Sequence, residues 1–397
     1  MSRPAHIAMI GTPMAGHVLP SLDIIRALVA RGHRVTYATA GHVAELMAHT
    51  GAELVHVAST LPVADSDWPQ DPIASASLFL DEAMAVLPQL HAAYDDAPAD
   101  LYLYDNGAYA GRALAEAQGR GLVQLSPAHV AWEGALEEVG AAFARLPGGS
   151  AHRARFAAWL ARCGAVTTNV EEFTGRPPRV LAMIPRAMQP YVDRVDTEAV
   201  TFVGPCFGAG GQQGGWMRPA GVEKVLLVSL GGSSYRRQRE IYGQCVAAFA
   251  DLPGWHVVLQ IATGGDPAEL GERVPPNFEA RPWVPPLTIL EQVDAWVTHT
   301  GMGSSGEGLY AGVPMIAVPH GAEQCLHADR LVELGVARRI DTADVTAAAL
   351  RTALMELIGD PQVAARSAWL WAEVRAEGGT RRAVELIEEQ LVMERVC

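Results

Sequence analysis

The chain has 397 residues, of which 49% are hydrophobic and 19% charged, so it is long and apolar enough for two domains with separate cores. Its net charge of −14 disfavours nucleic acid and anionic membranes as partners, because both attract basic protein surfaces. The five cysteines show no paired spacing and the N-terminus shows no signal peptide, which predicts a reduced, cytoplasmic protein without membrane insertion.

The first half of the chain alternates short apolar strands with helical patterns. Strands are predicted where apolar runs end in glycine or a polar residue, and helices where apolar residues recur every three or four positions. In chain order these elements cover strand 6–11, helix 21–33, strand 34–40, strand 100–105, helix 108–118 and strand 121–126. This alternation is typical of a parallel sheet with crossover helices.

Residues 206–222 interrupt the pattern with six glycines and little periodicity, which predicts a linker. After the linker the β/α pattern restarts. Its elements cover strand 224–232, helix 237–251, strand 256–262, strand 295–300, helix 304–311, strand 315–319 and helix 324–334. We therefore predict an α/β fold of two Rossmann-like domains, 1–205 and 223–375, facing across a cleft. The last segment, 376–397, is expected to form a helix that crosses back to the first domain.

The stretch 299–309, "HTGMGSSGEGL", follows a predicted strand and enters a helix, at the edge of a parallel sheet where ligands bind. Gly301 and Gly303 allow a ligand close to the backbone, and a helix N-terminus attracts anions. Ser304 or Ser305 could cap the helix and donate to a phosphate. Glu307, expected in the first turn, could accept hydrogen bonds from a ribose. A plain capped turn without a ligand is the alternative.

Two further segments have polar or aromatic residues near this loop. Trp283 lies between prolines in "RPWVPPLTIL" and could stack on a base, or it could anchor the core. Glu323 and Gln324 follow the strand ending in "VPHGA" and could hold sugar hydroxyls, or they could simply form the polar start of a helix.

His17 and Asp105 are predicted at corresponding ends of neighbouring strands in the first half. His17 lies at the start of the first helix, whose dipole disfavours the imidazolium, so a neutral, basic ring is expected. Such a histidine is a candidate general base, with Asp105 as its orienting carboxylate. A hydrogen-bonded histidine without a catalytic role is the alternative. No histidine spacing suits a metal and no GxSxG elbow occurs, so we predict no metal site and no bound cofactor.

Taken together, the motifs resemble one enzyme family over nearly the whole chain. They are "GHVLPSL", "LVARGHRVTYA", "WVP", "HTGMGSSGEGL", "GVPMIAVPHGAEQ" and "AEGGTRRAVELIE". In this order they resemble the GT-B nucleotide-sugar glycosyltransferases, above all the macrolide (oleandomycin-type) glycosyltransferases of actinobacteria. The resemblance implies an acceptor-binding first domain, a donor-binding second domain, and a nucleotide sugar as co-substrate.

The resemblance also assigns roles to residues. His17 would deprotonate the acceptor hydroxyl and Asp105 would orient it. Trp283 would stack on the base, His299 and Ser304 would contact the diphosphate, Glu307 the ribose, and Glu323 with Gln324 the hexose. The full set of expected donor-binding residues is Ser229, Gly231, Ser233, Trp283, Val284, His299, Gly301, Gly303, Ser304, Glu307, Glu323 and Gln324. Apart from the resemblance, Met14, Phe79, His129 and Trp132 are candidate acceptor-binding residues in the first half, with ordinary packing as the alternative for each, and the segment 61–72 could fold over the acceptor.

Three positions depart from the family pattern and bear on the donor sugar. Pro286 stands where glutamine is common, Glu323 where aspartate is frequent, and His327 where asparagine is common. The leading hypothesis is an inverting, metal-independent transfer of glucose from UDP-glucose to a hydroxyl of a macrolide or similar apolar product, for self-resistance or detoxification. Alternatives are a biosynthetic enzyme using a dTDP-deoxysugar, a non-catalytic GT-B partner protein, and a nucleotide-sugar epimerase. A monomer or a homodimer is expected.

Overall fold

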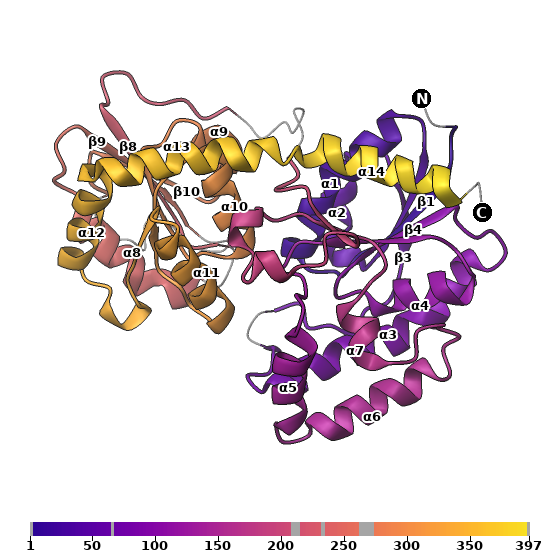
Figure 1. The fold of residues 1–397 in the computed structure, drawn as a ribbon. Coiled ribbons are helices and arrows are strands. Elements are labelled where there is room, and N and C mark those ends of the chain that lie inside the picture. Colours follow the sequence, from indigo (N-terminus) through magenta and orange to yellow (C-terminus); the bar gives the residue numbers. More distant parts are fainter. Residues whose placement is uncertain (1–2, 65–66, 208–214, 232–234, 262–273, 395–397) are drawn as a thin grey trace. The chain divides into compact units, whose positions relative to one another are not determined.

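The computed structural model describes residues 3–64, 67–207, 215–231, 235–261 and 274–394. The chain forms two compact units (Figure 1). Unit 1 contains residues 1–208 and 377–397, and unit 2 contains residues 209–376. Part of the predicted linker, 208–214, lies outside the described residues.

Within the described residues, unit 1 contains a seven-stranded parallel sheet in the order β3-β2-β1-β4-β5-β6-β7. Its strands are β1 (His6–Ile10), β2 (Arg34–Thr39), β3 (Glu53–His56), β4 (Leu101–Asp105), β5 (Leu122–Ser126), β6 (Val180–Ala182) and β7 (Val200–Phe202). Its helices are α1 (Ala15–Ala30), α2 (Ala44–Met47), α3 (Pro72–Tyr94), α4 (Tyr109–Ala117), α5 (Ala141–Arg145), α6 (Gly149–Leu160), α7 (Val170–Gly175) and α14 (Gly379–Glu394).

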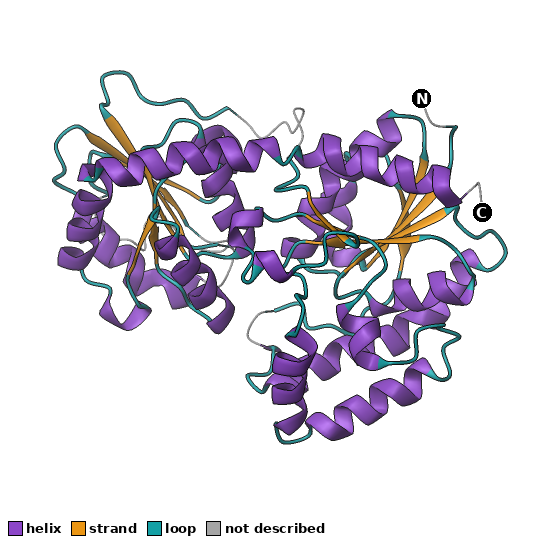
Figure 2. Ribbon diagram, viewed as in Figure 1, coloured by secondary structure: helices purple, strands orange, loops and turns teal. Residues whose placement is uncertain are grey.

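Helices cover both faces of this sheet, as Figure 2 shows, and the strand sequences explain why. Successive side chains of a strand point to opposite faces. Ile7 and Met9 of β1 belong to a core built with α1 and α14, whereas Ala8 and Ile10 belong to a core built with α3, α4 and α6. Because both faces are buried there, the central strands β1 and β4 are almost entirely apolar, whereas the edge strand β3 (ELVH) is not.

Helix α3 is long and apolar enough to span a membrane by length and composition. In the structure its residues Leu80, Ala83, Val86, Leu87 and Leu90 are buried in the core of unit 1. A core helix of a globular domain passes the same composition test, so the helix alone is weak support for a membrane span.

Helix α1 begins at Ala15, six residues before the predicted helical pattern at 21–33. Its first turn has no apolar periodicity because it lies at the edge of the sheet, and Pro20 lies inside the helix. Apolar spacing therefore detected the part of α1 that includes Ile24, Ile25 and Leu28, and it missed Val18, which is buried in the same core.

Unit 2 has a six-stranded parallel sheet, within the described residues, in the order β10-β9-β8-β11-β12-β13. Its strands are β8 (Lys224–Ser229), β9 (Trp255–Gln260), β10 (Phe278–Arg281), β11 (Ala295–Thr298), β12 (Met315–Ala317) and β13 (Ala337–Arg339). Its helices are α8 (Tyr235–Phe249), α9 (Pro286–Leu290), α10 (Met302–Ala311), α11 (Ala322–Glu333), α12 (Ala347–Gly359) and α13 (Pro361–Ala376). The predicted class of two α/β units with parallel sheets is confirmed.

In each unit the chain reverses its strand order beside the first strand. β1 lies between β2 and β4, and β8 lies between β9 and β11. The loops that follow these strands diverge to opposite faces, which leaves room for a ligand at the carboxyl edge of the sheet. The predicted site residues follow these strands.

Candidate functional site

His17 and Asp105 meet at the carboxyl edge of the unit 1 sheet. β1 and β4 are paired in register with Ile10 opposite Tyr104, so Asp105 at the end of β4 lies beside the loop that leads into α1. His17, the third residue of α1, has its Nδ1 atom 3.0 Å from both carboxylate oxygens of Asp105. The structure therefore brings this predicted pair together.

Asp105 is buried, with 1% of its side chain exposed, yet its charge is compensated by hydrogen bonds from the chain itself. The Thr12 hydroxyl and the Gly107 backbone N–H both donate to Oδ1, the latter at 2.9 Å. A carboxylate accepts hydrogen bonds, so the His17 proton facing it sits on Nδ1. That tautomer puts the lone pair of the ring on Nε2, the atom that a general base uses.

Phe79 lies beside this pair. A Cβ atom added to Gly107 would come within 3.1 Å of the Phe79 ring, 2.8 Å of the Thr12 hydroxyl and 3.3 Å of Asp105 Oδ1. Gly107 is thus a close-packed position where a larger residue would push these groups apart. The Phe79 ring also packs on Trp68, with 5.6 Å between centroids.

The other expected acceptor residues have mixed surroundings. Met14 is the N-cap of α1 and is partly buried. His129 and Trp132 follow β5, the neighbour of β4, in a segment held by the Gln189 side chain, which bonds both backbone groups of Val130. Trp132 packs on Tyr191, with 5.0 Å between ring centroids. Residues 65 and 66 of the predicted acceptor loop lie outside the described residues.

In unit 2 the glycine-rich loop turns from β11 into α10 at Gly301, which is the N-cap. The prediction that Ser304 or Ser305 caps the helix is wrong. Ser304 lies inside the first turn and its hydroxyl donates back to the Gly301 carbonyl at 3.0 Å, while Ser305 is fully buried. The helix begins at Met302, earlier than predicted, and directly before its N-cap Thr300 has a positive φ of 57°. A β-branched residue seldom adopts this conformation, which costs about 1–3 kcal/mol.

Glu307 is the sixth residue of α10, so it lies in the second turn and not in the first, as predicted. Burial raises the pKa of its carboxyl group to about 7. Among the described residues no side chain or backbone group bonds to it. The residue is partly buried, and desolvating a carboxylate without a partner is costly, so this position favours a ligand that supplies hydrogen-bond donors.

His299 lies between two glycines, one on each side of its ring. A Cβ atom at Gly231 or at Gly301 would lie 2.7 or 2.8 Å from the ring. Burial, aided by the positive charge that His320 and His327 can carry, lowers the pKa of His299 to about 4. The ring is therefore neutral near pH 7. Its Nδ1 atom is buried and has no hydrogen-bond partner among the described residues. His299 can offer an anion a hydrogen bond but not a charge.

Trp283 is 53% exposed in the loop that follows β10, so the alternative that it anchors the core is wrong. Its neighbour Val284 is buried and donates its N–H to the Gln260 side chain at 3.3 Å. The fixed Val284 thus holds an exposed indole at the carboxyl edge of the sheet. A flat, exposed ring in a proline-flanked loop suits base stacking.

The remaining predicted donor residues lie at the same edge. Ser229 ends β8 opposite Thr298, and Gly231 follows it with φ of 82°. Glu323 and Gln324 are in the first turn of α11. The Gln324 carbonyl Oε1 accepts from the His320 N–H at 2.8 Å, whereas its side-chain amide protons have no partner within the described residues. Ser233 lies outside the described residues.

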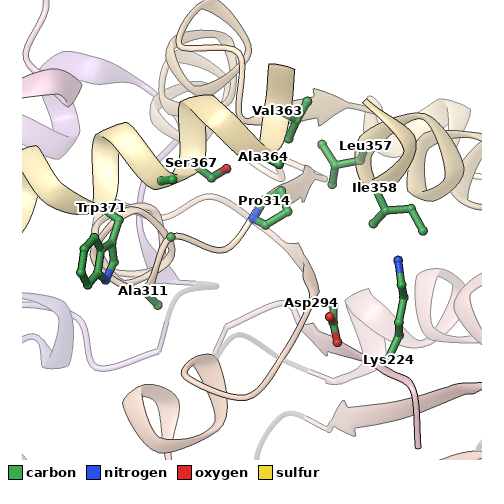
Figure 3. A pocket seen from close by; sticks show the side chains of 12 residues that line it. Lys224, Asp294, Ala311, Pro314, Leu357, Ile358, Val363, Ala364, Ser367 and Trp371 are labelled. Atoms are coloured by element: carbon green, nitrogen blue, oxygen red, sulfur yellow. The ribbon is translucent and has the colours of Figure 1, made fainter. Parts of the chain in front are cut away.

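A cavity of about 480 Å³ opens at the opposite edge of the unit 2 sheet, where the strands begin (Figure 3). Lys224, Asp294 and Pro314 line it from the sheet side, and α12 and α13 close it with residues such as Leu357 and Trp371. None of the predicted site residues lines this cavity. Among the described residues, no three histidine, cysteine or acidic side chains gather as a metal site.

Sequence reasoning missed three groups that shape these sites. Thr12 and Gly107 hold Asp105, and Thr300 sets the turn into α10. Only the glycine gave a signal, because it follows the strand end directly. The two threonines gave no signal, because a threonine in a sequence does not reveal whether it will form a buried hydrogen bond or adopt a left-handed backbone.

Comparison with known proteins identifies the family. A family model described as Erythromycin biosynthesis protein CIII-like, C-terminal domain, matches residues 253–389. Over 395 residues the chain is 49% identical to oleandomycin glycosyltransferase of Streptomyces antibioticus, covering 98% of this chain and 91% of that protein. The chain belongs to the natural-product glycosyltransferases.

Other relatives of this glycosyltransferase agree. It is 32% identical to the NDP-glycosyltransferase YjiC of Bacillus licheniformis, over 96% of this chain and 97% of that protein. The crystal structure of the glycotransferase of kitacinnamycin superposes with a TM-score of 0.89 at 48% identity, covering 98% of this chain and all of that one. A more distant fold neighbour, VinC, has a TM-score of 0.76 at 22% identity and was solved with dTDP. The predicted GT-B fold and enzyme class are confirmed.

Proposed function

We propose that this glycosyltransferase moves a hexose from a nucleoside diphosphate sugar, the donor, to a hydroxyl of a macrolide-like acceptor, with His17 as the general base. The observation that carries the proposal is the contact of His17 with Asp105, which is held by Thr12 and Gly107. These groups keep the imidazole oriented before any substrate binds. General bases of this kind accelerate proton removal by about 10²–10⁴-fold.

The proposed step is a direct displacement at the anomeric carbon. The acceptor hydroxyl gives its proton to His17 Nε2 while its oxygen bonds to C1 of the sugar. The bond between C1 and the diphosphate oxygen breaks, and the nucleoside diphosphate leaves with that electron pair. Attack from the face opposite the leaving group inverts the anomeric configuration.

The first turn of α10 and His299 are proposed to hold the leaving diphosphate. The backbone N–H groups of Met302, Gly303 and Ser304 have no acceptor among the described residues, as expected at a helix N-terminus. Neutral His299 adds a ring donor. These groups would stabilise the departing charge by hydrogen bonds, so the proposed reaction proceeds in the presence of EDTA.

We propose UDP-glucose as the donor, in a cytoplasmic reaction. Trp283 would stack on the base and Glu307 would accept from the ribose. The amide protons of Gln324 and the exposed carboxylate of Glu323 suit a hexose that keeps its hydroxyls. A dTDP-deoxysugar is the second candidate, and it is favoured by the dTDP bound to VinC. The described cysteines are free, as in a reducing compartment.

The test is product mass spectrometry. The protein is mixed with UDP-glucose or dTDP-glucose and a panel of macrolides, with EDTA present. A product heavier by one hexose is expected with UDP-glucose. Transfer from dTDP-glucose alone would overturn the UDP assignment, and loss of transfer in EDTA would overturn the proposed leaving-group stabilisation. A protein that binds either diphosphate and transfers from neither donor would point to a dedicated deoxysugar enzyme.

A further inference from the structure

Thr300 is held in an unusual conformation at the point where β11 turns into α10. It is fully buried, and it is one of two non-glycine residues with positive φ among the described residues. The left-handed region disfavours β-branched residues, so local sequence does not produce this turn. Contacts from elsewhere in unit 2 must hold it.

Those contacts come from α11. The His327 ring, which is 1% exposed, has Nδ1 at 3.0 Å from the Thr300 carbonyl. A carbonyl can only accept, so His327 donates. The Thr300 hydroxyl lies 3.1 Å from the Gln324 carbonyl, and 2.7 Å from the carbonyl of His299. The His327 side chain of α11 thus provides the hydrogen-bond donor for the Thr300 carbonyl.

The turn fixes two sets of groups on either side of Thr300. On one side the His299 ring packs against Gly231 and Gly301. On the other side Gly301 caps α10 and accepts from the Ser305 N–H at 2.9 Å, which leaves the first N–H groups of the helix without acceptors. Both sets are the proposed diphosphate contacts, so their position depends on the Thr300 backbone.

We infer that His327 is a positioning residue of the donor site, which holds Thr300 in its left-handed conformation and thereby sets His299 and the first turn of α10. The same helix has Glu323 and Gln324 in its first turn, so the His327 hydrogen bond joins the sugar-facing helix to the diphosphate loop. This inference rests on the proposed function, because it assigns these groups to a nucleoside diphosphate.

The first test is calorimetric titration of UDP and dTDP into wild type and His327→Ala. We expect the dissociation constant of the diphosphate that wild type binds to rise about ten-fold, the change that follows from losing about 1.4 kcal/mol. Steady-state kinetics should show a higher KM for the donor with an unchanged KM for the acceptor. His33→Ala is the matched control, because His33 is also a buried histidine and contacts the Glu388 side chain, but it lies in unit 1.

Two variants separate positioning from general loss of packing. In His327→Asn the amide nitrogen can take the place of Nδ1, so affinity should stay within about two-fold of wild type. In the double variant His327→Ala with Thr300→Gly, glycine adopts positive φ without steric cost, so most of the lost affinity should return. Because glycine adds no side chain to fill the space left by His327, a recovery of affinity can come only from the easier backbone conformation at position 300.

The outcomes separate the inference from the proposed function. If wild type binds a diphosphate and His327→Ala binds it equally well, the inference is wrong and the proposed function stands. The inference also fails if His327→Asn is as weak as His327→Ala, or if the glycine at 300 restores nothing. If folded wild type binds neither diphosphate, the proposed function itself fails and the inference fails with it.

Discussion

The His17 region of unit 1 and the glycine-rich loop of unit 2 differ in how completely the chain satisfies its own polar groups. The buried carboxylate of Asp105 accepts from Thr12, Gly107 and His17. In the loop, His299 Nδ1 and the Ser305 hydroxyl are buried without partners among the described residues, and the partly buried Glu307 carboxyl group, whose pKa is raised by desolvation, lies in the same loop helix.

This difference indicates two ways of building a site. In the proposed function, unit 1 would be ready for proton transfer before any ligand arrives, because the Asp105 carboxylate already has its hydrogen-bond donors. Unit 2 keeps unsatisfied donors and acceptors in a buried setting, which is costly until a ligand supplies the missing partners. Substitutions in unit 1 should therefore affect turnover, and substitutions in unit 2 should affect binding.

The largest effect is expected from His17→Ala, which removes the proposed base. Turnover should fall by about 10²–10⁴-fold, while the affinity for the diphosphate measured by calorimetry stays close to wild type. His91→Ala is the matched control, because His91 contacts Asp95 at 2.9 and 3.0 Å on the exposed side of α3 and should leave turnover unchanged. Loss of diphosphate binding in His17→Ala would contradict the division between the two regions.

Glu307→Ala should produce the next largest effect, in unit 2. Loss of an acceptor for the ribose hydroxyls should weaken diphosphate binding by roughly ten-fold or more, since hydrogen bonds to a charged group contribute about 1.5–3 kcal/mol. Calorimetry with UDP and with pyrophosphate checks this, because pyrophosphate has no ribose and should bind both proteins alike. Equal weakening of both ligands would refute the ribose contact.

Thr12→Val sharpens the comparison on the unit 1 side. It removes the hydroxyl that donates to Asp105 and keeps the side-chain shape, so the carboxylate loses part of its orientation. Turnover should fall by about ten-fold, in line with one hydrogen bond to a charged group. Thr12→Ser keeps the hydroxyl and should stay near wild type, and both should bind diphosphate normally. A valine variant with full turnover would show that Asp105 needs no help from Thr12.

The last effect concerns stability and its dependence on pH, and it does not involve turnover. The pKa of Glu307 is raised to about 7 in the folded protein from an ordinary value of 4.5. A raised pKa means that this group stabilises the fold fully below pH 4.5, and that the contribution is lost as pH rises through 7. Glu307→Gln should therefore stabilise the unliganded protein relative to wild type more at pH 8 than at pH 5, by at most about 3 kcal/mol. Denaturant titrations at both pH values measure this, and a pH-independent difference would contradict it.

Much of the fold could be predicted because burial on both faces makes the strands continuous apolar runs. β1, β4, β8 and β11 are such runs, and each ends where a polar site residue follows. The pairing of His17 with Asp105 followed from the rule that parallel strands end at one edge. The early start of α1 and the cap of α10 were predicted wrongly, because neither depends on an apolar pattern.

The details that control the site depend on contacts between residues far apart in sequence. Thr12 and Asp105 are 93 positions apart, and His327 lies 27 positions after Thr300. Trp283 illustrates the same limit, because the same tryptophan between prolines could equally be buried or exposed. In the structure Trp283 is exposed, while Val284 beside it is buried.

The last helix has a consequence for the order of events during synthesis. Ala383, Val384, Leu386, Ile387 and Leu391 of α14 belong to the same core as Ile7 and Met9, near the start of the chain (Figure 1). Unit 2 is translated in full before these residues leave the ribosome. Unit 1, whose synthesis begins first, is thus the last to complete its core. Until translation ends, the apolar face of its helix α1 stays exposed and prone to aggregation unless another molecule covers it.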